Sequence, residues 1–426
     1  MELGVVVVIA ALALVFLRVP IGVAFIVPSV VYIVITGVPV VTIAQRTMYS
    51  VNSYTILAVP LFIFVGSLLN QSGITDRIFE FTNHLVGHVS GGLAHVNIVA
   101  SLIFSGMSGA ALADVGGIGR MLIYAMDENG YERDYAAGLT SASATVGPIF
   151  PPSIPLIIFG LVGQVSIVSL FLAGVIPAIL SVLLLMGFTA YLARKRNFPT
   201  SESDISLRKT GKSFAIAFPA LLTPIVLISG MLTGAFGPTE IAAVTCVYVI
   251  AINVLLYGNR DVSYIFDASV EAVRSTSVIM FPLIGAALFG WVLTVEQIPN
   301  LVSNILFSVS TNPLVILLIL NIVILVIGLF LETVAALLML TPIFLPAVIK
   351  LGIDPIHFGV IMVFNLMIGL LTPPLGLSVY LSSDIADVPV ENVIKQVSFY
   401  YVPLVLTLLL ITFFPSIVLW LPKLVN

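Results

Sequence analysis

The chain has 426 residues, of which 60% are hydrophobic and 8% are charged, and its formal net charge is −4. A soluble domain carries about 25% charged residues, so most of this surface must face lipid or other helices. The small net charge gives no basis for binding nucleic acid. The composition therefore predicts an all-α protein that crosses a lipid bilayer several times.

The first apolar run begins directly after Met1 and Glu2 and extends to Leu17. A signal peptide would have a basic start and a cleavage site of small residues. Here Glu2 is acidic, and the run ends at Arg18-Val19-Pro20. We expect this stretch to be retained as a first membrane segment.

A membrane-spanning helix needs about 20 mostly apolar residues. Runs of this kind cover residues 3–17, 21–37, 54–70, 167–193, 214–233, 239–257, 276–294, 313–331 and 397–421. Four further apolar stretches are interrupted by Gly, Pro or polar residues: 89–126, 136–163, 328–349 and 357–385. The segment Thr75–Leu85 alternates charged and apolar residues, which predicts a helix lying at the membrane interface, with its charges simply solvated.

The longest polar stretch runs from Arg194 to Lys212 and separates two halves of similar length. It contains six of the sixteen basic residues: Arg194, Lys195, Arg196, Arg208, Lys209 and Lys212. The excess of basic residues in cytoplasmic loops places this segment in the cytoplasm. We therefore divide the chain into a first half at 1–193, a linker at 194–213 and a second half at 214–426.

The sequence lacks the residue patterns of ATP hydrolysis, disulfide frameworks, zinc sites and enzymatic catalysis. There is no GxxxxGK[ST] loop for ATP, so uphill transport would need an ion gradient or a separate subunit. The single cysteine, Cys246, and the four scattered histidines give neither a disulfide framework nor zinc-ligand spacing. No arrangement of nucleophile and base indicates an enzyme.

An internal repeat appears at an offset of 222 residues. It aligns the two Pro-Pro dipeptides, Pro151-Pro152 and Pro373-Pro374, which are alone of their kind in the sequence. The same offset aligns further pairs: Pro60-Leu61 with Pro282-Leu283, Gly106 with Gly328, Gly130 with Gly352, and Gly147 with Gly369. Duplicated halves, often of inverted topology, are typical of secondary transporters.

The interrupted stretches should carry the chemistry, because unwound backbone persists at membrane depth only where it lines a protein-buried cavity. Small residues and two serines over 104–117 suit the tip of a re-entrant hairpin, with close packing of small residues as the alternative. The segment 140–155 contains four prolines within eight residues, so its helix must break, with a simple kink as the alternative.

The second half has equivalents at Gly328–Pro342 and Asn365–Gly376. Both are less polar than their counterparts, so the two sites should differ in affinity for a cation. Four ionisable residues lie at or near membrane depth: Asp114, Arg120, Glu240 and Glu332. Such residues are functional candidates, but Glu240 also suits a helix N-terminus, and the roles of Asp114, Arg120 and Glu240 stay open.

Taken together, these segments resemble the large membrane subunit of TRAP (tripartite ATP-independent periplasmic) transporters over essentially the whole chain. The resemblance depends on the order and spacing of six motifs: Arg18–Gly22, Ala58–Ile63, 105–119, Gly147–Pro155, Gly237–Glu240 and Leu371–Gly376.

The resemblance implies a multi-pass protein of the bacterial inner membrane. It implies an elevator-type fold of about eleven transmembrane helices, with two inverted repeats and two re-entrant hairpins. It also implies Na⁺-coupled uptake of an organic acid of the sialic acid or C4-dicarboxylate class. The implied partners are a separate small four-helix membrane subunit and a periplasmic substrate-binding protein.

By position in the motifs, the resemblance also implies the binding residues. The expected Na⁺ ligands are Ser105, Gly106, Ser108, Thr145 and Gly147 in the first half, and Gly328, Thr333, Gly369 and Thr372 in the second. The expected contacts of the solute carboxylate are Ser108, Gly109, Thr145, Pro148, Glu332, Thr333 and Thr372. The alternative function is a passive channel for small anions, although channels are usually symmetric oligomers whose filter is lined by every chain.

Overall fold

The structure is a computed structural model that describes residues 2–196, 198–199, 207–259 and 261–425, and this part of the chain contains helices and no strands. The helices of the first half are α1 (Glu2–Phe16), α2 (Ile21–Thr36), α3 (Val41–Val51), η1 (Tyr54–Leu57), α4 (Ala58–Gln71), α5 (Ile74–Val86), α6 (Gly92–Ser108), α7 (Ala111–Asp114), the π-helical turn η2 (Val115–Gly119), α8 (Arg120–Glu128), α9 (Arg133–Ala144), η3 (Gly147–Ile149), α10 (Ile154–Gly163) and α11 (Ile167–Arg196).

The helices of the second half are α12 (Leu207–Leu232), α13 (Pro238–Leu255), α14 (Ser263–Val295), α15 (Ile298–Val309), α16 (Pro313–Gly328), α17 (Thr333–Lys350), α18 (Pro355–Leu371), α19 (Leu377–Ala386), α20 (Val390–Phe413) and α21 (Pro415–Val425). Local chemistry explains several of the boundaries. Asp354 accepts hydrogen bonds from the backbone N–H groups of Ile356 and His357, and Pro355 fits the first helical position of α18.

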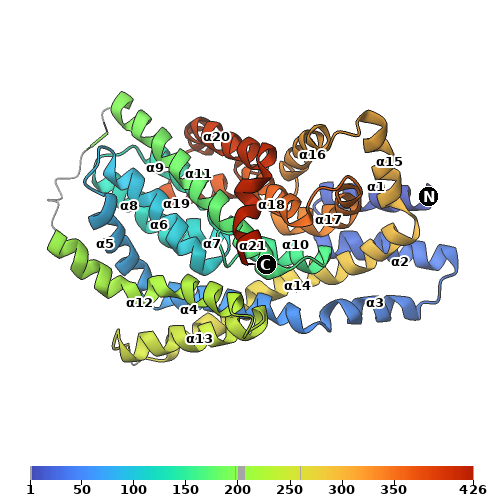
Figure 1. Ribbon diagram of the computed structural model, residues 1–426, viewed down its shortest axis with the longest axis horizontal. Helices are drawn as coiled ribbons and strands as arrows, with labels where there is room; N and C mark the ends of the chain where they lie inside the picture. The colour runs from blue at the N-terminus through green and yellow to red at the C-terminus, as the bar shows by residue number, and fades with distance from the viewer. Residues whose placement is uncertain (1, 197, 200–206, 260, 426) are drawn as a thin grey trace.

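The helices form two groups. Along the lower edge of Figure 1, α14 packs against α2, α3 and α4, and α4 packs in turn against α13. Above them lie the interrupted helices, in which α6, α9, α19 and α20 pack together and α17 packs against α10 and α18. The broken stretches of both halves are thus gathered in one block beside a layer formed by α2, α3, α4, α13 and α14.

The described residues contain seven helices long and apolar enough to span a membrane, or up to nine if each of two bent pairs forms one span. This is fewer than the eleven implied by the family resemblance. The reason is length: α1, α2, α6, α18 and α21 are apolar but have at most 17 residues each. The expected span at 397–421 is also divided, because α20 ends at Phe413 and α21 begins at Pro415.

Both ends of the predicted linker at 194–213 are helical in the structure. Arg194, Lys195 and Arg196 form the last turn of α11, where positive charge complements the helix dipole. Helix α12 already begins at Leu207, and residues 197 and 200–206 lie outside the described part of the chain. The predicted interfacial helix at Thr75–Leu85 is confirmed as a helix and corresponds to α5.

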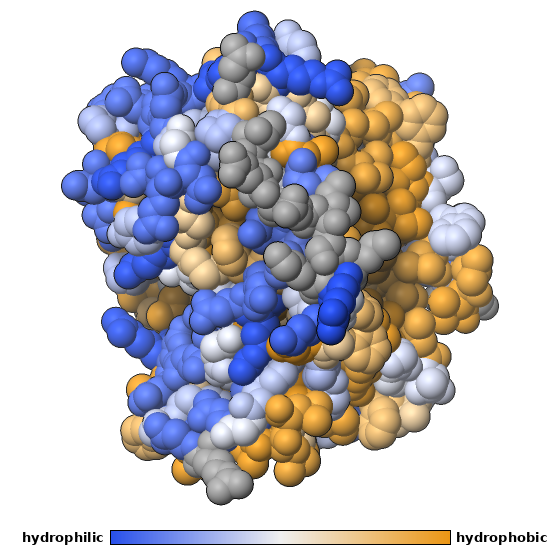
Figure 2. Space-filling view, turned by 90° about the vertical axis from the view of Figure 1, so that its left-hand side faces the viewer, coloured by the Kyte–Doolittle hydropathy of each residue, from blue (hydrophilic) through white to orange (hydrophobic). Residues whose placement is uncertain are grey.

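The surface agrees with immersion in lipid. Figure 2 shows hydrophilic residues gathered over one side of the view and a hydrophobic surface over the other. Many exposed side chains are large and apolar, among them Leu183, Val247 and Leu255. A soluble protein rarely exposes such extensive apolar surface, so these helices face lipid or partner subunits.

Candidate functional site

The first predicted hairpin tip lies where α6 ends and α7 begins. Gly109 ends α6 with a positive φ of 67°, a conformation that glycine adopts readily. Its carbonyl accepts a hydrogen bond of 3.3 Å from the backbone N–H of Ile154, at the start of α10. The hairpin tip and the break between α9 and α10, which both contribute expected Na⁺ ligands, are therefore joined through their backbones.

Ser105 and Gly147 lie in direct contact at this junction. A Cβ atom on Gly147 would fall 1.7 Å from Ser105 Oγ, so glycine is required for the approach. On another side, Ser105 Oγ donates a hydrogen bond of 3.1 Å to Asp114 Oδ2. The Ser105 hydroxyl therefore lies between a buried carboxylate and the broken helix.

The other predicted residues of the first site surround this contact. Ser108 is 8% exposed, and its hydroxyl has no hydrogen-bond partner among the described residues. Thr145 directs its hydroxyl to the Ala142 carbonyl at 2.7 Å, while the carbonyl of Pro148 accepts a hydrogen bond from Ser153. A Cβ atom on Gly106 would meet the Phe150 ring at 2.8 Å. All four of these positions are packed around the break.

The second hairpin tip repeats this arrangement. Helix α16 ends at Gly328, and the backbone N–H of Leu375 donates to the Leu329 carbonyl at 3.3 Å. A Cβ atom on Gly369 would lie 2.8 Å from the backbone C and O atoms of Gly328. The tip between α16 and α17 thus meets the break between α18 and α19, with a glycine contact and a backbone bridge like those of the first half.

The side chains of the second site differ from those of the first. Glu332 caps α17 by accepting from the N–H groups of Val334 and Ala335, at 3.0 and 3.3 Å. Thr333 is 4% exposed, and its hydroxyl has no partner among the described residues. The Thr372 hydroxyl donates to the Ile368 carbonyl at 2.8 Å. The cap does not test the predicted contact between Glu332 and the solute, which stays a prediction.

The two halves interlock. Helix α10, which follows the first break, packs against α17 of the second hairpin, and α19, which follows the second break, packs against α7 and η2 of the first hairpin. Ser141 on α9 bonds Ser382 on α19, with 2.6 Å between their hydroxyl oxygens. Each hairpin is therefore supported by the helix that leaves the break of the other half.

A pocket of about 130 Å³ lies between the first hairpin tip and helices α4 and α14. Ser108 and Ala110 of the tip line it, together with Ile154 at the start of α10. The opposite wall comes from α4 and α14 and contains four polar residues that sequence reasoning missed: Ser67, Asn70, Glu271 and Ser275. The signal available was the presence of Ser67 and Asn70 in an otherwise apolar span, but nothing in the sequence pairs that span with the tip.

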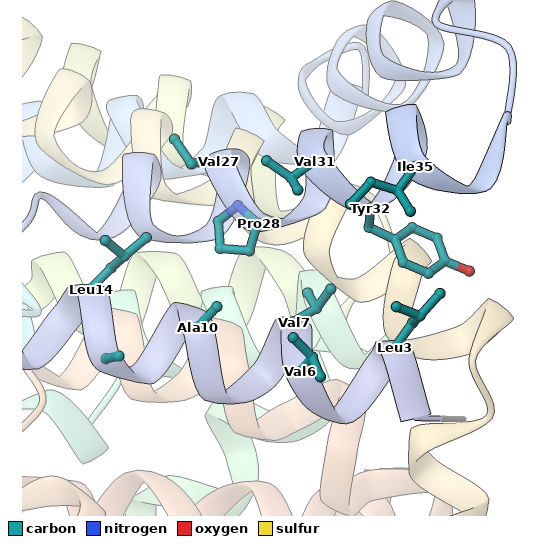
Figure 3. A pocket seen from close by; sticks show the side chains of 11 residues that line it. Leu3, Val6, Val7, Ala10, Leu14, Val27, Pro28, Val31, Tyr32 and Ile35 are labelled. Carbon is teal, nitrogen blue, oxygen red and sulfur yellow. The ribbon is translucent and has the colours of Figure 1, made fainter.

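Figure 3 shows a larger cavity, of about 380 Å³, between α1 and α2. Its lining is apolar apart from Tyr32, whose hydroxyl already donates to Glu296 at 2.8 Å. An organic acid would lose its hydration there without gaining a partner for its charge. This cavity is therefore not the solute site.

The remaining ionisable residues are placed differently from one another. Asp114 is 1% exposed and bonded to the first tip, whereas Arg120 is exposed on α8. Glu240 lies in the first turn of α13, where its negative charge interacts favourably with the positive end of the helix dipole. Cys246 is buried and free. Of the three residues whose roles the sequence left open, Asp114 is the one that belongs to the site.

The fold and the paired breaks define a class of protein: a multi-pass α-helical membrane protein whose helices unwind at two buried, matched places, as in secondary transporters. A solved structure shares the fold, the crystal structure of the YdaH transporter of Alcanivorax borkumensis, with a TM-score of 0.62 and 14% identity. The match covers 88% of this chain and 87% of the YdaH chain.

The family follows from the sequence comparisons. Residues 8–417 match the family described as the DctM component of the tripartite ATP-independent periplasmic transporter, and the chain belongs to this family. The sialic acid TRAP transporter large permease protein SiaM of Vibrio cholerae is 41% identical, over 97% of both chains. The C4-dicarboxylate TRAP transporter large permease protein DctM of Pseudomonas aeruginosa is 35% identical, over 90% of this chain and 89% of that one. The chain is thus a TRAP transporter large permease of the bacterial inner membrane.

Proposed function

We propose that this permease carries out Na⁺-coupled uptake of an organic acid of the sialic acid class. The observation that carries the proposal is the pair of matched breaks, each with a buried hydroxyl that lacks a partner, Ser108 in the first half and Thr333 in the second. Buried polar atoms are almost always hydrogen-bonded, so an orphaned oxygen beside unwound backbone suits a cation that takes oxygen ligands.

The residues present fit two sodium ions. In the first site, Ser105, Gly106, Ser108, Thr145 and Gly147 would supply hydroxyl and carbonyl oxygens. In the second site, Gly328, Thr333, Gly369 and Thr372 would do so. Bound sodium would supply the positive charge that a solute carboxylate needs, because Glu271 is the sole charged residue that lines the pocket beside Ser108, and it is negative.

The sialic acid class is favoured over C4-dicarboxylates on two grounds. The SiaM relative is more similar than the DctM relative, at 41% against 35% identity. A second carboxylate on the solute would also be repelled by Glu271, whereas the hydroxyl and amide groups of a sialic acid can donate to it.

We further propose an elevator movement of the block that contains both hairpins against the layer formed by α2, α4, α13 and α14. The contact between these parts is close and involves small residues: a Cβ atom on Gly66 of α4 would lie 2.9 Å from the Ser108 Cα atom. A small four-helix membrane subunit and a periplasmic binding protein would complete the system, with the binding protein delivering the solute.

The test is uptake of radiolabelled sialic acid into proteoliposomes that contain the permease with its small subunit, with the binding protein outside. Uptake should saturate and require an inward Na⁺ gradient, and an excess of succinate should not compete. Uptake that is indifferent to Na⁺ refutes the coupling. A steady conductance without saturation would favour the passive channel instead.

A further inference from the structure

We propose that Asp114 is the positioning residue of the first sodium site: its carboxylate turns the Ser105 hydroxyl so that the oxygen faces the ion, and supplies the negative charge that balances it. This inference rests on the sodium site proposed above and adds to it a residue that is not a direct ligand.

The orientation of the Ser105 hydroxyl is the first step. A serine hydroxyl has one hydrogen to donate and two lone pairs. In the structure the hydrogen goes to Asp114 Oδ2, at 3.1 Å, because a carboxylate can only accept. On its other side Ser105 Oγ lies against Gly147, at the break between α9 and α10, so its lone pairs are directed away from Asp114 and toward the broken helix. A cation needs this orientation, since a hydrogen directed at it would repel it.

The charge of Asp114 is the second step. Its side chain is 1% exposed, the groups that bond it are the neutral hydroxyls of Ser105 and Ser101, and no basic side chain of the described residues pairs with it. A buried and unpaired carboxylate costs several kcal/mol. A sodium ion at Ser105 removes this imbalance.

Among the residues that the structure describes, the surroundings of Asp114 offer no other cation. The buried polar groups between α6 and α9 are neutral and bond one another: Asn97 donates to Thr140 at 2.7 Å, and Ser143 donates to Asn97 at 2.8 Å. Immediately after Asp114, the chain forms the π-helical turn η2, which contains three glycines. Such turns are rare and frequently mark functional sites, where they redirect neighbouring side chains.

The second half lacks this device. The residue at an offset of 222 from Asp114 is Ala336. The carboxylate of the second tip, Glu332, is instead bonded to backbone N–H groups of its own helix. The structure thus assigns a balancing carboxylate to the first site alone, and this is the physical form of the inequality that the sequence predicted between the two sites.

The experiment is a double-mutant cycle on the complex of the permease with its small subunit. The variants are Asp114→Asn, Ser105→Ala and the two combined, with Asp127→Asn as the matched control. Asp127 belongs to the same hairpin, but its carboxylate pairs with Arg133 outside the site, at 2.7 Å. Two quantities are measured at constant ionic strength: the rise in unfolding temperature as Na⁺ is added without solute, and the Na⁺ dependence of uptake.

Removing a residue that orients a metal ligand typically costs 10–100-fold in affinity. Asp114→Asn should therefore raise the half-saturating Na⁺ concentration about 10-fold or more in both measurements, while the KM for solute at saturating Na⁺ stays unchanged. Because Asp114 acts through Ser105, the effects of the two substitutions should not multiply. The half-saturating Na⁺ concentration of the double variant should be at most about twofold higher than that of the single variant with the lower Na⁺ affinity. Asp127→Asn should behave as the unchanged protein does.

Three results would overturn the inference: unchanged Na⁺ affinity in Asp114→Asn, effects of the two substitutions that multiply, or loss of solute KM and Na⁺ affinity by equal factors. Where Asp114→Asn does not fold, the smaller Asp114→Ser replaces it in the same cycle. Failure of the underlying sodium site has a different signature, because Ser105→Ala, Ser108→Ala and Thr145→Ala would then all leave Na⁺ binding unchanged.

Discussion

Replacing Gly147 by alanine should disrupt the first site through a single added methyl group. The new Cβ atom would lie 1.7 Å from Ser105 Oγ and 1.9 Å from Ser105 Cβ. An ordinary van der Waals contact begins at 3.4 Å, so the overlap is about 1.7 Å. Rotating the serine side chain moves Oγ but leaves Cβ in place, so the overlap can be relieved solely by separating the hairpin from the broken helix.

Overpacking of this kind typically costs about 1–3 kcal/mol. Gly147→Ala should therefore lower the unfolding temperature of the purified complex and weaken Na⁺ binding. The structure also specifies the compensating change. Without its side chain, residue 105 would present its Cα atom at 3.3 Å from the new methyl group, which is close to a normal contact. The double variant Gly147→Ala/Ser105→Gly should recover the stability of Ser105→Gly alone. That stability is below that of the unchanged protein, by about 1 kcal/mol for a glycine inside a helix and further because Asp114 loses its hydrogen bond from Ser105.

The assay is thermal unfolding in detergent, with and without Na⁺, for the two single variants and the double variant. Recovery of thermal stability without recovery of Na⁺ binding is the expected result, because the double variant lacks the Ser105 hydroxyl. The reasoning is refuted if Gly147→Ala unfolds and binds Na⁺ as the unchanged protein does, or if the double variant is as unstable as Gly147→Ala.

Three further changes test other contacts, each by thermal unfolding in detergent. Gly369→Ala should destabilise the second site without a compensating partner, because its neighbours at 2.8 Å are backbone atoms of Gly328; full stability would contradict this. Glu332→Ala removes the cap of α17 and should cost about 1 kcal/mol, which Glu332→Asp should partly restore. Tyr135→Phe removes the hydrogen bond of 2.8 Å between the buried hydroxyls of Tyr135 and Tyr400 and should cost about 1 kcal/mol; an unchanged unfolding temperature would show that the bond contributes nothing.

The breaks were predictable from sequence because their causes are local. Proline lacks an N–H group, so the prolines around 148–155 end α9 wherever the rest of the chain lies. The 222-residue offset then located the second break, and the structure confirms it between α18 and α19.

The walls of the site were not predictable in the same way. Ser67, Asn70 and Glu271 belong to α4 and α14, which are far apart in sequence and whose side chains carry no sign that they meet the first tip. Their proximity depends on how long helices pack, which periodicity alone does not determine. The number of spans also depends on length: apolar runs of 15 to 17 residues form α1, α2, α6 and α18, and such helices are short for a membrane core of about 30 Å.

The two sites share a backbone design and differ in their charges. Both tips are joined to their breaks by one hydrogen bond of 3.3 Å and one glycine contact, so the duplication accounts for the carbonyl oxygens of each site. Side chains must then set any difference in affinity. The main difference is that the buried carboxylate of the first half, Asp114, is bonded to the Ser105 hydroxyl, whereas that of the second half, Glu332, caps a helix. Charge acts over longer distances than a hydrogen bond. The different placement of the two carboxylates should therefore affect Na⁺ affinity more than the presence of Ser108 in one site and Thr333 in the other. We therefore expect the first site to fill at the lower Na⁺ concentration, and Asp114→Asn to bring the two half-saturating concentrations together.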